Sequence, residues 1–369
     1  MNTWFLIRLH KVKAALFVLV SLLFWSNIHP QAADNEFIEK GRQVIQDLII
    51  SYEIPGLSVS ISKGGELIWS EGFGYADLEQ KVSVYSNKTK FRIGSVSKPL
   101  TAVALALLYE QGKINLDISI QNYVPDFPEK KDSITLRLLA GHLAGIRHYK
   151  NDEFLSDKYY ETISEGLDIF KDDPLINVPG TKFSYSSYGW NLISAAIENA
   201  AEKPFLDYMK FQVFEAMGMT QTYADQKYKI IPYRTRFYTN NSKEGIIYNA
   251  PSVDNSYKLA GGGFISTSED LIKFGNQLIE HHFIKKETLE EFIDPQQTKN
   301  GEKTKYGMGF VSDNDSNGKY WFGHSGGSIG GVTRFAVYPK EKLVIAIVTN
   351  CSNVAYGNTV SQLALIFSK

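Results

Sequence analysis

The sequence predicts an α/β protein of the α+β type, in which one antiparallel sheet of N- and C-terminal strands is flanked by helices and carries an inserted, mainly helical lobe. Apolar residues alternate as in strands in residues 57–69 and again in short segments of residues 306–349. Residues from about 115 to 255 instead read as helices joined by long loops. Because strands occur near both ends, we expect them to pair in one sheet, with a pocket where the lobe meets it.

Composition is that of an ordinary globular protein. Of the 369 residues, 43% are hydrophobic and 21% are charged, which is enough apolar material for a sizeable core. The formal net charge of −1 indicates neither a nucleic-acid footprint nor an acidic tail, so no nucleic-acid partner is expected. Cys351 is the only cysteine, which excludes an internal disulfide, and we expect it to be a small buried residue at a strand end.

The N-terminus has the pattern of a secretory signal peptide. Basic residues precede the apolar run at residues 14–25, and small residues follow it near residue 33. This run is shorter than the roughly 20 residues that a membrane-spanning helix needs, which disfavours an anchor. For a bacterial source we therefore expect residues 1–33 to be removed, the protein to be periplasmic or secreted, and membrane contact to occur only through the transient signal.

The mature domain, residues 34–369, begins with a predicted helix and hairpin. Apolar residues recur at helical spacing in residues 35–52, and a Pro-Gly pair then ends that helix. The stretch LSVSISKGGELIWSEGFGYAD alternates on both sides of a Gly-Gly turn, which predicts a β-hairpin. Residues 99–111, PLTAVALALLYEQ, are strongly helical, and Gly112 closes the helix.

The C-terminal part is predicted to return to the sheet. Residues 260–280 give a glycine cluster and then a helix, whose start carries overlapping capping-box patterns. Short strands follow in residues 306–349, and a helix ends the chain. This division predicts a sheet subdomain of about residues 34–93 and 256–369, and a helical lobe of about residues 94–255.

Two tetrapeptides, SISK at Ser60 and SVSK at Ser95, match the motif S-x-x-K, in which a lysine can activate a serine nucleophile. A match is expected about once by chance in such a chain, so local structure has to separate the two. On the predicted strand, Ser60 and Lys63 face opposite ways. At the predicted helix start, Ser95 and Lys98 share a face, and the helix N-terminus suits a developing oxyanion. From this segment alone, Ser95 is either a plain N-cap or a nucleophile.

Three stretches, in order along the chain, resemble motifs of the serine β-lactamase and penicillin-binding protein superfamily, in particular its class C and esterase-like branch. FRIGSVSKPLTA resembles the nucleophile motif, PGTKFSYSSYGWNLISAAIE the Y-x-N tyrosine motif, and GHSGGSIGG the K/H-[ST]-G motif. The resemblance covers roughly residues 36–350, and the phrases GIRHY and YSSYGWNL are similar to those of the mitochondrial serine β-lactamase-like proteins and their bacterial relatives. It implies a β-lactamase/transpeptidase-like fold.

The resemblance also implies roles for individual residues. Ser95 would be the nucleophile, Lys98 with Tyr185 its coupled acid/base, and His324 a group that orients the substrate or helps proton transfer. Lysine and tyrosine titrate near about 10.4 and 10 when unperturbed, but a shared, partly buried site lets them exchange a proton. The residues that would bind the substrate are Ser187, Ser325, Gly326 and Gly327, with the Gly327 N–H joining the Ser95 N–H in an oxyanion hole.

The predicted function is that of an exported serine hydrolase, which forms a Ser95 acyl-enzyme and cleaves an amide, peptide or ester bond. Its substrate would be a small molecule or a peptide, such as a peptidoglycan-like peptide, an ester or a β-lactam. Ser187 stands where the family usually has asparagine, and a hydroxyl has a shorter reach and fewer donors than an amide, which disfavours efficient β-lactam hydrolysis. The alternatives are a class C-like β-lactamase or D-Ala-D-Ala carboxypeptidase, and a catalytically silent binding module on the same fold.

The remaining polar clusters are predicted to be non-catalytic. His142 and His148 are interpreted as loop residues near the site, since no H-E-x-x-H motif or carboxylate cluster supports a metal, and no cofactor is expected. His281-His282 lies at a predicted helix end. Asp152-Glu153 and Glu290-Glu291 are predicted to be solvated faces.

Overall fold

The computed structural model describes residues 29–241 and 245–369. Most of the predicted signal peptide, residues 1–28, lies outside this described part. The helix α2 (His29–Tyr52) starts within the last residues of the predicted signal and continues beyond them. Among the helices at residues 29–241 and 245–369, none has the length and apolar character that crossing a membrane requires.

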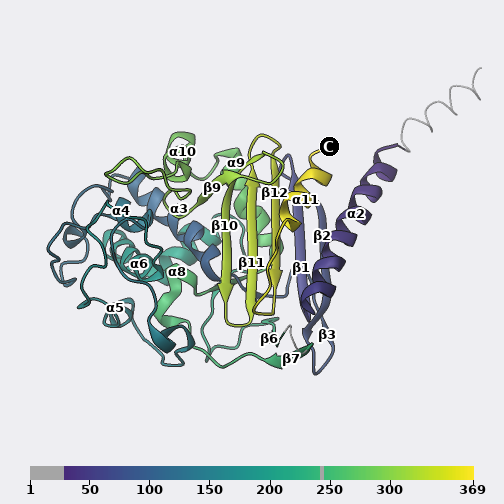
Figure 1. The fold of residues 1–369 in the computed structure, drawn as a ribbon, viewed down its shortest axis with the longest axis horizontal. Coiled ribbons are helices and arrows are strands. Elements are labelled where there is room, and N and C mark those ends of the chain that lie inside the picture. The colour runs from purple at the N-terminus through teal and green to yellow at the C-terminus, as the bar shows by residue number, and fades with distance from the viewer. Residues whose placement is uncertain (1–28, 242–244) are drawn as a thin grey trace, which may run out of the picture.

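One antiparallel sheet of seven strands runs through the middle of the described chain (Figure 1). Its order is β3-β2-β1-β12-β11-β10-β9, so the N-terminal hairpin lies beside the C-terminal strands. Strands β1 and β12 pair along their whole length, with Ser60 paired to Ala346. This pairing of the two chain ends confirms the predicted fold class. The strands are β1 (Gly56–Lys63), β2 (Glu66–Asp77), β3 (Val82–Ser83), β9 (Val311–Asn314), β10 (Tyr320–Ser328), β11 (Gly331–Tyr338) and β12 (Leu343–Thr349).

Helices cover both faces of this sheet. Helices α2 and α11 (Thr359–Phe367) lie on one face, where Ile345 and Ile347 of β12 point. Helix α9 (Ser268–Glu280) lies on the other face, together with Val344. All residues of β12 are buried, which explains why LVIAIVT reads as a continuous apolar run rather than as an alternating one.

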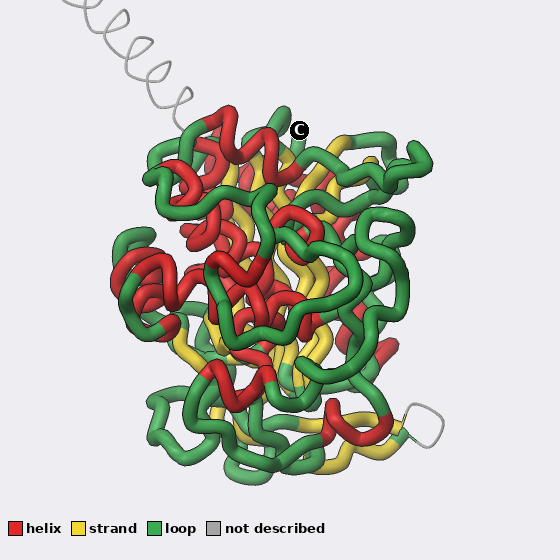
Figure 2. The backbone as a smooth tube through the Cα atoms, turned by 90° about the vertical axis from the view of Figure 1, so that its left-hand side faces the viewer, coloured by secondary structure: helices red, strands yellow, loops and turns green. Residues whose placement is uncertain are grey.

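Short helices and long loops form a lobe beside the sheet, and Figure 2 shows them in front of the strands. The mainly helical lobe expected from the sequence is therefore present, although much of it is loop. Its central helix, α6, is buried over most of its length. The helices on this side of the molecule are α3 (Ser97–Glu110), α4 (Leu136–Ala140), α5 (Ile163–Leu167), α6 (Ser187–Ala201), α7 (Phe205–Tyr208), α8 (Leu259–Gly262) and α10 (Lys286–Ile293).

Several short strands differ from the expectation. Residues 306–310, predicted as a strand, form bends that reach β9 through a single bridge between Tyr306 and Val311. Two small sheets that the sequence did not predict occur among the loops, because such short strands depend on tertiary pairing rather than on an alternating pattern. Their strands are β4 (Phe91–Arg92), β8 (Phe264–Ser266) and β5 (Tyr223–Ala224) in one sheet, and β6 (Tyr238–Asn241) and β7 (Ile246–Asn249) in the other.

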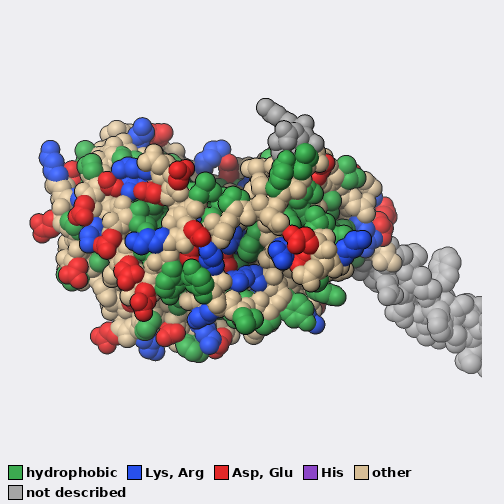
Figure 3. Space-filling model, turned by 90° about the horizontal axis from the view of Figure 1, so that it is seen from below, with side chains coloured by type: hydrophobic (Ala, Val, Ile, Leu, Met, Phe, Trp, Pro, Cys, Tyr) green, Lys and Arg blue, Asp and Glu red, His purple; other side chains and the backbone are tan. Residues whose placement is uncertain are grey.

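Charged side chains are placed in two ways. Over the face seen in Figure 3, basic and acidic side chains are interspersed, in keeping with the net charge of −1. Arg92 and Asp225 instead form a buried ion pair, with exposed side-chain fractions of 7% and 2% and an Nε–Oδ2 distance of 2.6 Å. Asn255 donates to the same carboxylate at 2.7 Å, and Arg92 also donates to the Ile329 carbonyl at 2.8 Å. The pair therefore ties the short sheet to the turn after β10.

Replacing Asp225 with alanine is expected to lower the free energy of unfolding by about 3–5 kcal/mol, because the Arg92 guanidinium stays buried without its carboxylate. Urea unfolding followed by circular dichroism measures the change. The matched control is Glu290→Ala, which removes the exposed ion pair with Lys286 and is expected to cost less than about 0.5 kcal/mol. Equal costs for the two variants would contradict the prediction.

Candidate active site

Ser95 lies where β4 turns sharply into helix α3. It is the middle residue of the 3-10 turn Gly94–Val96, and α3 follows directly from Ser97. Gly94 has a φ of +51°, and a Cβ there would lie 2.6 Å from the Gly327 carbonyl oxygen, so both the backbone and the space require glycine. The turn places the Ser95 N–H at a helix start, where backbone N–H groups have no i−4 partner.

Lys98 lies under the Ser95 hydroxyl. Its side chain is fully buried, and its Nζ is 3.0 Å from Ser95 Oγ, 3.1 Å from Ser187 Oγ and 2.5 Å from the Gly261 carbonyl oxygen. Burial lowers the pKa of Lys98 well below its usual value, and the nearby charge of Lys258 lowers it further. A neutral amine has two N–H donors and one lone pair. If it donates to Gly261 and Ser187, the lone pair is directed to the Ser95 proton.

Tyr185 contacts Ser95 from the other side. Its hydroxyl donates to Ser95 Oγ at 2.8 Å, and the Lys98 Nζ lies 4.8 Å from the centre of its ring. Burial raises the pKa of Tyr185 well above its usual value, although the hydrogen bond to Ser95 opposes this shift. Burial thus favours the neutral forms of both groups, with the proton on Tyr185 and a lone pair on Lys98.

The second S-x-x-K stretch is built differently. Ser60 lies on β1, and its hydroxyl is hydrogen-bonded to Ser70 at 2.9 Å and to Ser268 at 2.7 Å. Lys63, three residues on, reaches the Lys369 carbonyl oxygen instead. The two side chains therefore lie apart, as the strand periodicity predicted.

His324 is buried on strand β10 behind Tyr185. Its Nε2 lies 2.8 Å from the Tyr306 hydroxyl and its Nδ1 lies 2.5 Å from the Ser325 carbonyl oxygen, while its ring centre is 6.3 Å from that of Tyr185. Burial lowers the pKa of His324 to about 3, so the ring is neutral and has one N–H. Because a carbonyl only accepts, Nδ1–H donates to Ser325 and Nε2 accepts from Tyr306. These contacts place His324 beside the site, where it is hydrogen-bonded to Tyr306 and Ser325 rather than to Ser95.

The residues after His324 bring the β10 backbone to Ser95. Strand β9 pairs with β10 only as far as Gly323, so the backbone beyond it is on the edge of the ladder. A Cβ on Gly326 would lie 1.9 Å from the Ile93 carbonyl oxygen, so only glycine lets the strand pass so close. Gly327 follows and lines the cavity. Ser325 is exposed. Because side chains alternate along a strand, its side chain points to the opposite face of β10 from that of the buried residues 324 and 326.

A cavity of about 480 Å³ opens over Ser95. Of the predicted site residues, Ser95, Ser187 and Gly327 line it, whereas Ser325 and Gly326 do not. The other lining residues come from the loop after α4, from the segment around α8, and from the chain after β10 and β12. They are His148, Tyr149, Phe154, Lys258, Gly261, Gly262, Ser328, Ile329, Val332, Ser352 and Asn353.

Two neutral histidines hold the tyrosine motif in place. His142 and His148 accept the backbone N–H groups of Ser186 and Ser187 through Nδ1, at 3.1 and 3.2 Å. Burial lowers the pKa of both rings, that of His148 to about 4. The ring of His142 also lies 4.2 Å from that of Tyr185, centre to centre. The prediction that both histidines lie near the site is confirmed, and the structure gives them a positioning contact that the sequence did not reveal.

Other parts of the surroundings were missed or misinterpreted. Glu153, predicted to lie on a solvated face, is an ion-pair partner of the buried Arg147 and accepts the Tyr188 hydroxyl at 2.8 Å. That prediction was wrong because the local pattern reveals neither that Arg147, six residues away, is buried nor that Tyr188 lies close in space. No role was predicted for Tyr306 or Lys258 either, since neither lies in the nucleophile, tyrosine or K/H-[ST]-G motif. Within residues 29–241 and 245–369, no His, Cys, Asp and Glu side chains group as metal ligands.

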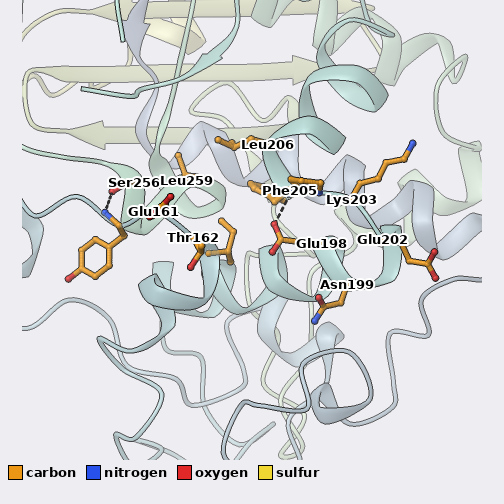
Figure 4. Close-up of a pocket in the computed structure, with 13 residues that line it drawn as sticks. Glu161, Thr162, Glu198, Asn199, Glu202, Lys203, Phe205, Leu206, Ser256 and Leu259 are labelled. Carbon is orange, nitrogen blue, oxygen red and sulfur yellow. Dashed lines mark hydrogen bonds between the residues drawn. The ribbon is translucent and has the colours of Figure 1, made fainter. Parts of the chain in front are cut away.

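Figure 4 shows a second pocket, between α5, α6 and α7. Its hydrogen bonds are structural: Glu198 accepts the Phe205 N–H and Ser256 accepts the Tyr160 N–H, both at 2.8 Å. None of the predicted site residues lines it. The same segment of the chain contributes to both pockets. Ser256 and Leu259 line this second pocket, whereas Lys258, which lies between them in the sequence, lines the Ser95 cavity.

Comparison with known proteins agrees with this geometry. The Beta-lactamase family model matches residues 41–364. The human mitochondrial serine beta-lactamase-like protein LACTB is 32% identical over 90% of this chain and 80% of its own length. Penicillin-binding protein 4* of Bacillus subtilis is 26% identical over 79% of this chain and 67% of its own.

Solved structures give the same result for the fold. The octameric penicillin-binding protein homologue from Pyrococcus abyssi superposes with a TM-score of 0.77 at 25% identity, covering 90% of this chain and 78% of its own. The D-amino acid amidase from Ochrobactrum anthropi SV3 gives a TM-score of 0.78 at 20% identity, covering 90% and 98%. The chain therefore belongs to the Beta-lactamase family and is a serine hydrolase with the β-lactamase fold.

Proposed function

We propose that this protein is an exported hydrolase that cleaves an amide, peptide or ester bond through an acyl-enzyme on Ser95. The observation that carries the proposal is the position of Ser95 Oγ between two groups of opposite character, 3.0 Å from the neutral amine of Lys98 and 2.8 Å from the hydroxyl of Tyr185. A serine hydroxyl is a weak nucleophile and needs a base within hydrogen-bonding distance. A base and an acid touching the same oxygen supply both proton transfers of acyl transfer.

Acylation follows from these positions. Lys98 takes the Ser95 proton as Oγ attacks the substrate carbonyl, and the N–H groups of Ser95 and Gly327 donate to the oxyanion that forms. Tyr185 then gives its proton to the leaving group, and the Lys98 ammonium returns a proton to the phenolate. In deacylation the same pair accepts a proton from the water that attacks the acyl carbonyl, and returns it to Ser95 Oγ as the bond to the acyl group breaks and the acid leaves.

The proposed substrate class rests on the relatives, and the proposed export rests on the N-terminal sequence pattern. The relatives include a penicillin-binding protein and an amidase that acts on amino-acid amides, so a small molecule or a short peptide is the proposed substrate. The Ser187 hydroxyl is hydrogen-bonded to Lys98 and to the Tyr149 hydroxyl. It is therefore not free to donate to a β-lactam as the amide of an asparagine would be. Export rests on the pattern of residues 1–33, whereas the human relative is mitochondrial. N-terminal sequencing of protein recovered outside the cytoplasm tests it.

A fluorophosphonate probe is expected to label the wild-type protein once, on Ser95, as shown by peptide mass spectrometry. Ser95→Ala should not be labelled, because Ser95 carries the hydroxyl that both Lys98 and Tyr185 contact. Ser60→Ala is the matched control from the second S-x-x-K stretch and should be labelled like the wild type. A wild-type protein that stays unlabelled, or a label that persists in Ser95→Ala, would sink the proposal.

A further inference from the structure

Lys258 is a buried cation beside the Ser95 cavity that the reaction does not use. Its side chain is 2% exposed, and its Nζ has no hydrogen-bond partner among the described residues. Three aromatic rings surround the amine, with centres 4.2 Å away for Phe154, 5.2 Å for Tyr257 and 5.6 Å for Tyr149. Aromatic faces attract a cation, but they do not replace the acceptors that an ammonium loses on leaving water.

The charge of this amine is finely balanced. Burial lowers the pKa of Lys258 to about 7, with Arg92 lowering it further and Asp225 opposing the shift. Within residues 29–241 and 245–369, none of the side chains that line the cavity is Asp or Glu. The side chains that line the cavity therefore supply no carboxylate counter-charge to hold the ammonium form.

The cavity that Lys258 lines is the catalytic one. Lys258 lines the same cavity as Ser95, whereas its neighbours Ser256 and Leu259 belong to the separate pocket of Figure 4. Because the Nζ has almost no solvent contact, a ligand has to shift a neighbouring ring to reach it. Phe154 lines the cavity, and the centre of its ring is 4.2 Å from the Lys258 Nζ. A group that binds there enters from the side where the substrate lies.

We propose that Lys258 determines substrate specificity by binding a carboxylate of the substrate, so that substrates carrying an acidic group are preferred over neutral ones of the same shape. This inference rests on the proposed Ser95 hydrolase. A carboxylate supplies both missing features at once, an acceptor for the Nζ and a counter-charge for the ammonium. The carboxylate belongs either to the acyl group or to the leaving group, and two substrate pairs separate these sources.

The test measures kcat/KM for matched esters. The first pair is the p-nitrophenyl monoester of succinic acid and the same ester with its free carboxylate methylated. The second pair is 4-carboxyphenyl acetate and 4-carbamoylphenyl acetate. In one of the pairs the wild type should prefer the acid about 10- to 100-fold, as expected for a buried charge-assisted hydrogen bond, and Lys258→Met should lose this preference. Lys258→Arg, which keeps the charge, should restore part of it.

The control variants distinguish a failure of the Lys258 proposal from a failure of the proposed Ser95 hydrolase. Lys113→Met, at an exposed lysine after α3, should keep the wild-type preference. If Lys258 acted only through the pKa of Lys98, its replacement would change all four rates alike and leave the ratios intact, which would overturn the proposal. Equal rates for acid and neutral esters in the wild type would also overturn it. Turnover that persists in Ser95→Ala would instead reject the proposed function, and thermal melts confirm that each variant is folded.

Discussion

Replacing Lys98 with methionine is expected to lower kcat/KM by about 10³-fold while raising thermal stability at neutral pH. The loss of rate follows because the amine that contacts Ser95 Oγ, the proposed base, is removed, and general acid–base catalysis contributes about 10²- to 10⁴-fold. The gain in stability follows because the thioether has a similar length and no charge to desolvate, which outweighs the loss of the hydrogen bonds to Gly261 and Ser187. A catalytic residue that costs stability is the expected compromise at such a site.

The gain in thermal stability of Lys98→Met is expected to depend on pH. The pKa of Lys98 is lowered in the folded protein, so between that value and about 10.4 the unfolded chain binds more protons than the folded one. The Lys98 contribution to stability therefore becomes less favourable as pH falls from about 10.4 towards the folded pKa. Lys98→Met lacks this contribution, so its advantage in Tm over the wild type should be larger at pH 7 than at pH 10.

Lys90→Met is the matched control for a buried lysine. Lys90 is 1% exposed, and its Nζ donates to Gln221 and to two backbone carbonyls, so its removal leaves these acceptors without a donor. We expect this variant to melt at a lower temperature and to keep most of its activity per folded molecule, the reverse of Lys98→Met. Activity that survives in Lys98→Met, or a Tm that falls, would contradict the prediction.

The parts of the fold that the sequence predicts are those with long regular patterns. The hairpin around Gly64-Gly65, the helix after Ser95 and the strands before Thr349 each carry a periodicity that survives in the structure. Strands β5, β6 and β7 have two to four residues each, and their positions depend on long-range contacts such as that of Arg92 with Asp225. A local pattern has no access to those contacts, so these strands were read as loop.

The residues of the candidate site likewise differ in whether a local sequence pattern predicts them. Ser95 and Lys98 are three residues apart on one helix, so helical periodicity alone brings them together. Tyr185 is ninety residues from Ser95, and only the family resemblance placed it there. Lys258 belongs to no motif, and its significance appears only when the structure shows a buried Nζ without a partner. The sequence thus identifies local pairs such as Ser95 and Lys98, whereas a residue such as Lys258 becomes apparent only from tertiary packing.

Gly326→Ala is expected to lower kcat/KM by about 10²- to 10³-fold, the cost of losing one oxyanion donor. The new Cβ would lie 1.9 Å from the Ile93 carbonyl oxygen and 3.2 Å from the Ser95 nitrogen. Because backbone atoms cannot yield as a flexible side chain does, β10 has to move away from the turn before α3. That movement carries the Gly327 N–H away from the position where the oxyanion forms, even though no catalytic side chain has changed.

The neighbouring glycine provides the control for this effect. A Cβ on Gly327 would meet no atom within 4 Å, and alanine keeps the backbone N–H, so Gly327→Ala is expected to lose less than about tenfold. Both variants are compared as kcat/KM on one neutral ester, with Tm measured in parallel. Similar losses in the two would mean that the approach of β10 to Ser95 does not set the rate. A large loss confined to Gly326→Ala, in a protein that still unfolds cooperatively, ties catalysis to the contact between one strand edge and one helix start.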